Sequence, residues 1–571
     1  MDNNLTASLI KDIKPGADSS NPGFLDDVNG NLLFTTFDTN SLNTQLWKTD
    51  GSEAGTVLVQ DSGGNSFPPI DVVKVNDLIY FLQVSGFTNK SLIRTDATAD
   101  GTFSIVNVSL RAPADISNLT RLNETIFYTS FDSSDLFQSK LFKIENNTNQ
   151  PVQVKQDISS GGGNVEDLIA VNNTLFFSAN ASSIQNTPDK ELWKSDGTDA
   201  GTVLVKNINP NDSSNPDLLA DINGTLLFSA EDGTNGRELW KSDGTDSGTV
   251  LIKDINPGND SSISPTPFTA PTSNSGNKFA DVNGTFYFVA DDGTNGNELW
   301  KSDGTEAGTV LVKDIVSGNE GSNPNNLINV NGTLFFSVND GNSGVELWKS
   351  DGSESGTTLV KDINPGENSS NPANLISLDG ILYFTADDGS NGVELWKSDG
   401  TEAGTVLVDD INPGNASSNP GDFTEFSGEL YFNADDGVNG RELWGLTEGG
   451  TKPNQDLILG GDSDDVLVGK EQDNIIDGLK GDDTLTGGSG RDKFVLSSEF
   501  GNDVITDFTL GEDEIINVTD RIVLTVASIG DAVNVAFSNT GDILQLNLNG
   551  NEQADLENYL LNISSNQDLP Y

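Results

Sequence analysis

The chain has 571 residues, of which 87 are acidic and 30 basic, giving a formal net charge of −57. It contains neither cysteine nor histidine, which excludes disulfides, thiol nucleophiles, histidine-based zinc motifs and serine–histidine–aspartate triads. The negative charge opposes binding to nucleic acid and to anionic membranes. No apolar run reaches the roughly 18 residues of a membrane span, and residues 1–4 show no basic region that would begin a cleavable export signal.

A repeat of about 48 residues dominates the first four-fifths of the chain. All seven tryptophans lie in a Glu-Leu-Trp or Gln-Leu-Trp motif, and the last four are 48 residues apart. Ile93 and Phe142 take the tryptophan position in two degraded copies, so nine units run from about residue 14 to residue 450. Such a period indicates one supersecondary unit stacked on its own copies. The tryptophans are Trp47, Trp193, Trp240, Trp300, Trp348, Trp396 and Trp444.

Each unit contains four short β-rich runs separated by glycine turns, most clearly in residues 279–315. Asn283-Gly284 predicts a tight hairpin, because a type I′ turn needs positive φ at both central residues. Phe286 to Val289 is apolar on both alternating faces, which predicts a strand covered on both sides. Four-stranded blades arranged around an axis satisfy that requirement.

The two ends of the repeat region complement each other. The ninth unit lacks its last strand after Trp444, and residues 7–13 at the start of the chain have the sequence of that missing strand. The N-terminus can therefore complete the last blade. We predict an all-β fold, a β-propeller-like ring of about nine four-stranded units, although propellers usually have roughly 4–8 blades.

Residues 1–450 resemble the bacterial ELWxxDGT-repeat proteins, whose motif is seen here in Glu298 to Thr305. The resemblance implies a repetitive β-structure in bacterial surface or secreted proteins and no known chemistry. The tryptophan position accepts Ile93 and Phe142, which favours blade-to-blade packing over sugar stacking.

An acidic loop in several units has two interpretations. Asp291 to Glu298, with copies at 387–394 and 435–442, clusters carboxylates with Asn and Gly as calcium loops do. A hairpin accounts for the same residues and is favoured, since their spacing fits no known calcium loop. The repeated Asn-Gly-Thr reads formally as a glycosylation acceptor, but a hairpin is again sufficient.

The composition changes after residue 450. Residues 451–459 are a predicted linker, and a nine-residue rhythm begins at Gly460, Gly469, Gly478 and Gly487. The last copy fits Gly-Gly-x-Gly-x-Asp-x-apolar-x at every position. Four copies in register resemble the RTX, or hemolysin-type, calcium-binding nonapeptide, which forms a parallel β-roll. We therefore predict an RTX roll with its closing segment over residues 460–517.

Two nonapeptides make one 18-residue turn, so Asp465 is expected to face Asp483, and Asn474 to face Asp492. Facing carboxylates and glycine carbonyls can supply the six to eight oxygens that Ca²⁺ takes, and binding is expected to be coupled to folding. A flexible acidic linker would not explain the apolar residue at the eighth position of each nonapeptide, Leu467, Ile476, Leu485 and Phe494. Non-glycine residues and Asn474 limit the expected number of ions to one to three. The predicted ligands are Asp462, Asp464, Asp465, Asn474, Gly481, Asp483, Gly490 and Asp492.

Residues 518–571 are a predicted C-terminal cap with a short helix near its end. In RTX proteins this region carries an uncleaved type I secretion signal, which the resemblance implies here. The expected function is that of a secreted, calcium-binding structural or adhesive protein of the bacterial cell surface or matrix, without catalysis. The expected location is extracellular, and a monomer is expected.

Two alternatives remain open. A propeller could recognise surface glycans or other extracellular proteins, using units two and three or the insert at 261–276. A glycoside hydrolase needs only two carboxylates, which 87 acidic residues could conceal. The expected partners are calcium, the type I secretion machinery and such extracellular ligands.

Overall fold

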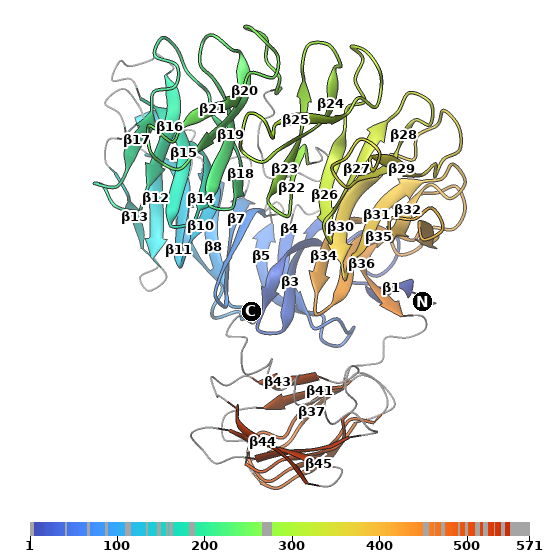
Figure 1. Ribbon diagram of the computed structural model, residues 1–571. Coiled ribbons are helices and arrows are strands. Elements are labelled where there is room, and N and C mark those ends of the chain that lie inside the picture. The colour runs from blue at the N-terminus through green and yellow to red at the C-terminus, as the bar shows by residue number, and fades with distance from the viewer. Residues whose placement is uncertain are drawn as a thin grey trace. The chain divides into compact units, whose positions relative to one another are not determined.

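The computed structural model divides the chain into two compact units, residues 1–449 and residues 450–571 (Figure 1). The residues that the structure describes are 5–39, 43–64, 69–85, 89–108, 116–132, 135–145, 150–155, 158, 164–181, 189–264, 277–448, 456–461, 463–469, 474–488, 492–496, 501–508, 514–517, 523–529, 532–537 and 543–548.

The first unit is a β-propeller of nine four-stranded antiparallel blades. The first strands of neighbouring blades contact one another around the ring. These first strands are β2 (Gly23–Val28), β6 (Ile70–Val75), β10 (Ile116–Leu122), β14 (Glu166–Val171), β18 (Asp217–Ile222), β22 (Phe279–Val282), β26 (Asn325–Val330), β30 (Ala373–Leu378) and β34 (Gly421–Phe426). The second strands are β3 (Asn31–Asp38), β7 (Leu78–Ser85), β11 (Thr125–Asp132), β15 (Thr174–Asn180), β19 (Thr225–Glu231), β23 (Thr285–Asp291), β27 (Thr333–Asn339), β31 (Ile381–Asp387) and β35 (Glu429–Asp435).

The third and fourth strands complete each blade. The third strands, which carry the tryptophan position, are β4 (Asn43–Thr49), β8 (Asn89–Thr95), β12 (Asp135–Glu145), β16 (Lys190–Ser195), β20 (Arg237–Ser242), β24 (Asn297–Ser302), β28 (Val345–Ser350), β32 (Val393–Ser398) and β36 (Arg441–Glu448). The fourth strands of the first eight blades are β5 (Val57–Gly64), β9 (Phe103–Val108), β13 (Pro151–Gln153), β17 (Val203–Lys206), β21 (Val250–Lys253), β25 (Val310–Lys313), β29 (Thr358–Lys361) and β33 (Val406–Asp409).

The N-terminal strand completes the ninth blade, as predicted. β1 (Leu5–Lys11) pairs antiparallel with β36, and Leu9 lies opposite Trp444. The blade therefore has the order β1-β36-β35-β34, and β34 contacts β2 of the first blade. The ring is closed, and its nine blades confirm the unit count.

The hairpin predicted from Asn283-Gly284 is present between β22 and β23. Asn283 has φ of 53° and Gly284 has φ of 81°, which is the backbone that a type I′ turn requires. In the strand that follows, β23, the side chains of Phe286, Tyr287 and Phe288 are buried, so the strand is covered on both sides.

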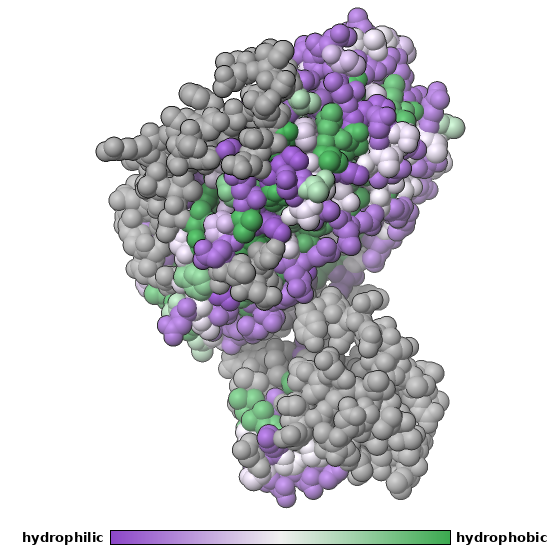
Figure 2. All heavy atoms as spheres, turned by 90° about the vertical axis from the view of Figure 1, so that its left-hand side faces the viewer, coloured by the Kyte–Doolittle hydropathy of each residue, from purple (hydrophilic) through white to green (hydrophobic). Residues whose placement is uncertain are grey.

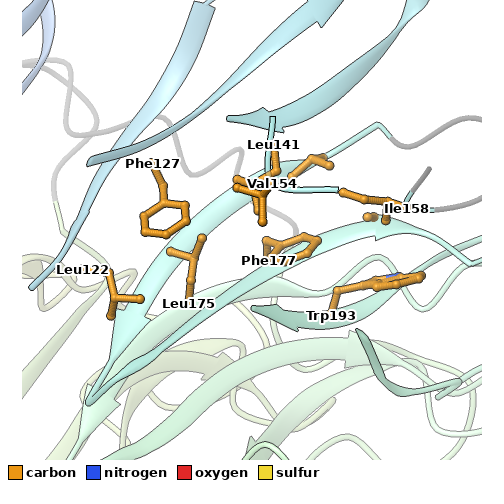
Figure 3. Close-up of a cluster of buried hydrophobic side chains, with 10 residues drawn as sticks. Leu122, Phe127, Leu141, Val154, Ile158, Leu175, Phe177 and Trp193 are labelled. Atoms are coloured by element: carbon orange, nitrogen blue, oxygen red, sulfur yellow. The ribbon is translucent and has the colours of Figure 1, made fainter. Parts of the chain in front are cut away.

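Neighbouring blades pack through apolar clusters, one of which is drawn in Figure 3. There Phe177 and Trp193 of the fourth blade pack with Phe127 of the third. The rings of Phe177 and Trp193 are stacked, with centroids 6.4 Å apart. In another junction, Lys313 of the sixth blade lies over the Trp348 ring of the seventh, 5.5 Å from its centroid. The tryptophans thus pack between blades.

A buried glutamate ties six of the blades to the segment that enters the next blade. At the ring closure, Glu442 accepts hydrogen bonds from Ser20 N (2.9 Å), Ser20 Oγ (2.6 Å) and Ile13 N (3.0 Å). Glu346 makes the equivalent bonds with Ser370 and Ile363. These glutamates are fully buried, and they are Glu191, Glu238, Glu298, Glu346, Glu394 and Glu442.

The second unit contains two sheets of mainly parallel strands. One has the order β37 (Asp456–Leu459), β39 (Asn474–Asp477), β41 (Lys493–Leu496) and β43 (Glu514–Asn517). The other has the order β38 (Val466–Val468), β40 (Thr484–Thr486), β42 (Val504–Phe508), β46 (Ile543–Leu548), β45 (Ala532–Phe537) and β44 (Val523–Ile529). At the predicted apolar position Ile476, Leu485 and Phe494 are buried and Leu467 is half-buried; Ile505 is buried as well.

Two sequence boundaries differ from the structure. β37 lies inside the segment predicted as a linker, because its residues pair in parallel register with β39, Asp456 opposite Asn474. β44–β46 lie in the predicted cap, yet they extend the β38 sheet through the β42–β46 pair. The predicted short helix and the C-terminal signal region, residues 549–571, lie outside the described residues.

The described surface of the propeller is largely hydrophilic in the view of Figure 2, with smaller apolar groups. Some of the exposed apolar side chains begin fourth strands, among them Val203, Val250 and Val310. In the described ranges, no helix has the length and apolar character needed to cross a bilayer.

Candidate metal centre

One edge of the roll carries a column of aspartates directly before the strands of the β38 sheet. Asp465 precedes β38, Asp483 precedes β40, and Asp503 precedes β42. Asp483 Oδ1 accepts a hydrogen bond from Asp465 N (2.8 Å), and Asp503 Oδ1 accepts one from Asp483 N (3.0 Å). The carboxylates of Asp483 and Asp503 are therefore held against the backbone of the preceding turn, whereas Asp465 Oδ2 accepts a hydrogen bond from Gly461 N (2.7 Å).

The second oxygens of this column lack partners. Asp483 and Asp503 are each 1% exposed, and the Oδ2 atom of each is buried without a hydrogen-bond partner. Burial, the charge of Asp483 and that of Asp482 raise the pKa of Asp503 to about 7. Burial and the charges of Asp465, Asp464 and Asp482 also raise the pKa of Asp483. Buried carboxylates without a counter-charge are unfavourable in the ionised form, so this edge is suited to a cation.

Glycines permit the close approach of successive turns. A Cβ on Gly460 would collide with Gly478 O and would lie 3.1 Å from Asp465 Oδ2. A Cβ on Gly478 would collide with the Asp483 carboxylate. Gly460 thus leaves a space that is bordered by a carboxylate oxygen of its own nonapeptide and by a carbonyl oxygen of the next turn.

The opposite edge has the same architecture with an amide in place of one carboxylate. Asn474 N and Asn474 Nδ2 both donate to Asp492 Oδ1, each at 2.8 Å. Asn474 Nδ2 also donates a hydrogen bond to Gly487 O (3.2 Å). The Asn474 and Asp492 side chains face each other across one turn, as predicted.

The other predicted ligands have varied positions. Asp464 Oδ1 accepts a hydrogen bond from Asp482 N (3.0 Å) on the exposed side of the turn. Gly481 has φ of 137°, and its carbonyl oxygen lies against Gly501 of the following turn. Asp462 and Gly490 lie outside the described residues.

Several polar residues of the roll were missed by the sequence prediction. Asp503 continues the aspartate column, and Asp482 Oδ1 accepts hydrogen bonds from Asn502 N (2.9 Å) and Nδ2 (3.0 Å). Asp507 accepts bonds from Gly487 N and Gly488 N, both 2.8 Å. The sequence does indicate this continuation, because residues 501–506 match residues 481–486. The match is easily overlooked, since the two segments are 20 residues apart instead of 18.

The donor set at the aspartate edge fits Ca²⁺. Carboxylate and carbonyl oxygens are the ligands this hard cation prefers, and it takes six to eight of them. In the part of the chain that the structure describes, no group of three or more acidic side chains converges on one point. Asp465 and Asp483 would therefore hold the ion together with carbonyl oxygens such as Gly478 O.

The acidic loops of the propeller are built as turns. Asp292 Oδ1 accepts hydrogen bonds from Thr294 N (2.9 Å), Thr294 Oγ1 (2.7 Å) and Asn295 N (2.9 Å). Its Oδ2 accepts one from Asn295 Nδ2 (2.8 Å). These bonds lower the pKa of Asp292 despite its desolvation. The carboxylate stabilises its own loop, in accordance with the hairpin interpretation.

Comparisons with known proteins address the two units differently. A family model of the RTX calcium-binding nonapeptide repeat, in four copies, matches residues 459–494. The chain therefore carries RTX nonapeptide repeats, and the match covers the Asp465, Asp483, Asn474 and Asp492 positions. No curated protein matches the chain in sequence.

Solved structures that are similar to the chain have low sequence identity to it. A prolyl endopeptidase is 12% identical over 71% of this chain and 55% of that chain, with a TM-score of 0.36. A puromycin hydrolase is 13% identical over 69% and 62%, with a TM-score of 0.31. An acylaminoacyl peptidase from Pyrococcus horikoshii is 8% identical over 79% and 62%, with a TM-score of 0.33. The chain spans less than two thirds of each of these proteins.

Proposed function

We propose that this protein is a secreted, calcium-binding structural or adhesive protein of the bacterial cell surface or extracellular matrix. The observation that carries the proposal is the aspartate edge of an RTX roll, where buried Asp483 and Asp503 each have an oxygen without a partner. A cation at this edge would neutralise the column and join successive turns. The ELWxxDGT resemblance of residues 1–450 supports the surface location.

Calcium would couple the folding of the roll to its surroundings. In calcium-poor cytosol the carboxylates of successive turns repel one another, which favours an unfolded roll and its export. Extracellular modules bind Ca²⁺ with dissociation constants of roughly 10⁻⁴–10⁻³ M. Export by the type I machinery and folding outside the cell would follow from this difference in calcium concentration.

We also propose that the protein is not an enzyme. The sequence has no histidine or cysteine for a nucleophilic or general-base system. In the propeller, the buried glutamates such as Glu442 bond to serine and backbone donors of the neighbouring segment. Their role is structural in this account. Turnover of a polysaccharide that disappears when one propeller carboxylate pair is mutated would contradict it.

Calcium titration of the full chain tests the calcium proposal. The purified protein, stripped with chelator, is titrated with Ca²⁺ alone in an isothermal calorimeter. The wild type is expected to bind saturably, and the Asp465→Asn/Asp483→Asn double variant is expected to lose affinity. Asp199→Asn is a matched control on the propeller, since the Asp199 side chain is 77% exposed. Absence of saturable binding by the wild type would refute the proposal.

A further inference from the structure

The two edges of the roll offer an internal comparison at atomic detail. At one edge, the position of a Cβ on Gly460 lies beside Gly478 O and 3.1 Å from Asp465 Oδ2. At the other edge, the position of a Cβ on Gly469 lies beside Gly487 O and 2.8 Å from Asn474 Nδ2. The Asn474 amide nitrogen thus takes the place that a carboxylate oxygen has at the first edge.

The two equivalent positions carry opposite hydrogen-bonding groups, a donor at one edge and an acceptor at the other. Asn474 Nδ2 is a donor, and it bridges Gly487 O (3.2 Å) and Asp492 Oδ1 (2.8 Å). Asp465 Oδ2 is an acceptor that takes a hydrogen bond from Gly461 N (2.7 Å), it borders the same glycine as Gly478 O, and Asp483 follows on the next turn. Facing acceptors need a positive charge between them, whereas an amide joins the same groups by hydrogen bonds alone.

The aspartate edge also continues past the nonapeptides matched by the family. Asp503 lies nine residues beyond the matched range, which ends at residue 494. It repeats the contact of Asp483, since its Oδ1 accepts the hydrogen bond from the backbone N–H of the preceding aspartate. Its Oδ2 is buried without a partner, like that of Asp483. The next turn therefore repeats this hydrogen bond and this unpartnered carboxylate oxygen, in spite of its two extra residues.

We propose that calcium binds at only one edge of the roll, at two consecutive steps, Asp465–Asp483 and Asp483–Asp503. At the other edge, the Asn474 amide takes the place of an ion. The Asp483–Asp503 step is a calcium site beyond the nonapeptide repeat. The proposal rests on the calcium binding proposed above and specifies where the ions lie. It differs from the sequence expectation that Asn474 and Asp492 are calcium ligands.

Counting the calcium ions bound by single variants of the full chain tests this arrangement. Competition with a chromophoric chelator of comparable affinity, about 10⁻⁴–10⁻³ M, counts sites in the range proposed above, and binding to the acidic surface cancels in the comparison of each variant with the wild type. Asn474→Asp is expected to bind one ion more than the wild type, because a carboxylate oxygen replaces the amide nitrogen. Asp503→Asn is expected to bind one ion fewer, and the exposed Asp199→Asn control is expected to bind the wild-type number.

The outcomes separate the two proposals. A wild type that binds no calcium up to millimolar concentration refutes the proposed function. A wild type that binds calcium, with Asn474→Asp or Asp503→Asn at the wild-type count, overturns the one-edge arrangement and leaves the proposed function standing. Should Asp503→Asn prevent the roll from folding, the count for Asn474→Asp decides, since that change adds a ligand and removes none of the aspartate column.

Discussion

At the scale of single residues, the tryptophans act through their bulk. Trp300 and Trp396 are each 5% exposed, and in both the indole Nε1 is buried without a hydrogen-bond partner. The ring of each packs with the apolar clusters of its blade junction. This agrees with the presence of Ile93 and Phe142 at the same position of other units.

Trp300→Phe should therefore be tolerated far better than Trp300→Ala. Truncation of a buried aromatic residue to alanine costs about 3–5 kcal/mol, whereas phenylalanine keeps most of the apolar contact and removes only an unpaired N–H. Denaturant unfolding of the propeller, with calcium held constant, measures both changes. Equal destabilisation by the two variants would show that the indole N–H has a bonding role.

The buried glutamates make the propeller sensitive to pH. Burial raises the pKa of Glu442 to about 7, although Ser20 and the Ile13 backbone oppose the rise by hydrogen bonding. The ordinary value, 4.5, applies to the unfolded chain. Because the folded-state pKa is raised, the protonated form favours folding. This contribution is complete below pH 4.5 and is lost as the pH rises through 7.

Glu442→Gln removes this titration. As the pH rises from 4.5 to 8, the wild type should lose stability relative to the variant by about 1–3 kcal/mol, given about 1.4 kcal/mol per pKa unit. Unfolding of both proteins across this range, at fixed calcium, provides the measurement. A stability difference that does not change with pH would indicate that Glu442 stays ionised throughout.

At the scale of elements, ring closure depends on β1 and on the segment that follows it. β1 pairs along β36, while Ser19 and Ser20 bond to Arg441 and Glu442 of the same strand. The closure was predictable because the missing strand and the N-terminal segment have the same sequence pattern. The serine–glutamate contact was not predicted, since its partners are distant in sequence. A Ser-x-Pro motif recurs with the 48-residue period at Ser322, Ser370 and Ser418, and it could have indicated this contact.

Deletion of residues 1–13 should lower the melting temperature and promote self-association, because an unpaired edge strand is a template for other chains. Ser20→Ala should be milder. It removes one donor to a buried carboxylate, at a cost of about 1–3 kcal/mol, and leaves the strand in place. Thermal unfolding and light scattering test both. A deletion variant that stays monomeric with unchanged melting would argue against closure by β1.

At the scale of the whole molecule, the sequence predicted the architecture better than the site. The nine blades and the roll follow from repeats, in which many copies reveal which positions are apolar. Asp503 was missed because two extra residues break the 18-residue step. The role of Asn474 depends on which of its atoms faces Gly487 O, and spacing alone cannot show that.

Export should depend on the second part of the chain. Removal of residues 456–571 takes away the roll and the region in which RTX proteins carry their secretion signal, so the truncated protein should stay inside the cell. Immunoblots of cells and medium, with the full chain as control, measure its distribution. Normal secretion of the truncated protein would contradict export through this region.

The central claim is that calcium folds the roll, and hydrogen exchange on the full chain tests it most directly. Amides of β38, β40 and β42 should be exchanged rapidly in chelator and become strongly protected in millimolar Ca²⁺, the range in which extracellular modules bind. Amides of β23, β27 and β31 in the propeller provide the internal control and should change little. Equal protection of the roll strands with and without calcium would contradict the account.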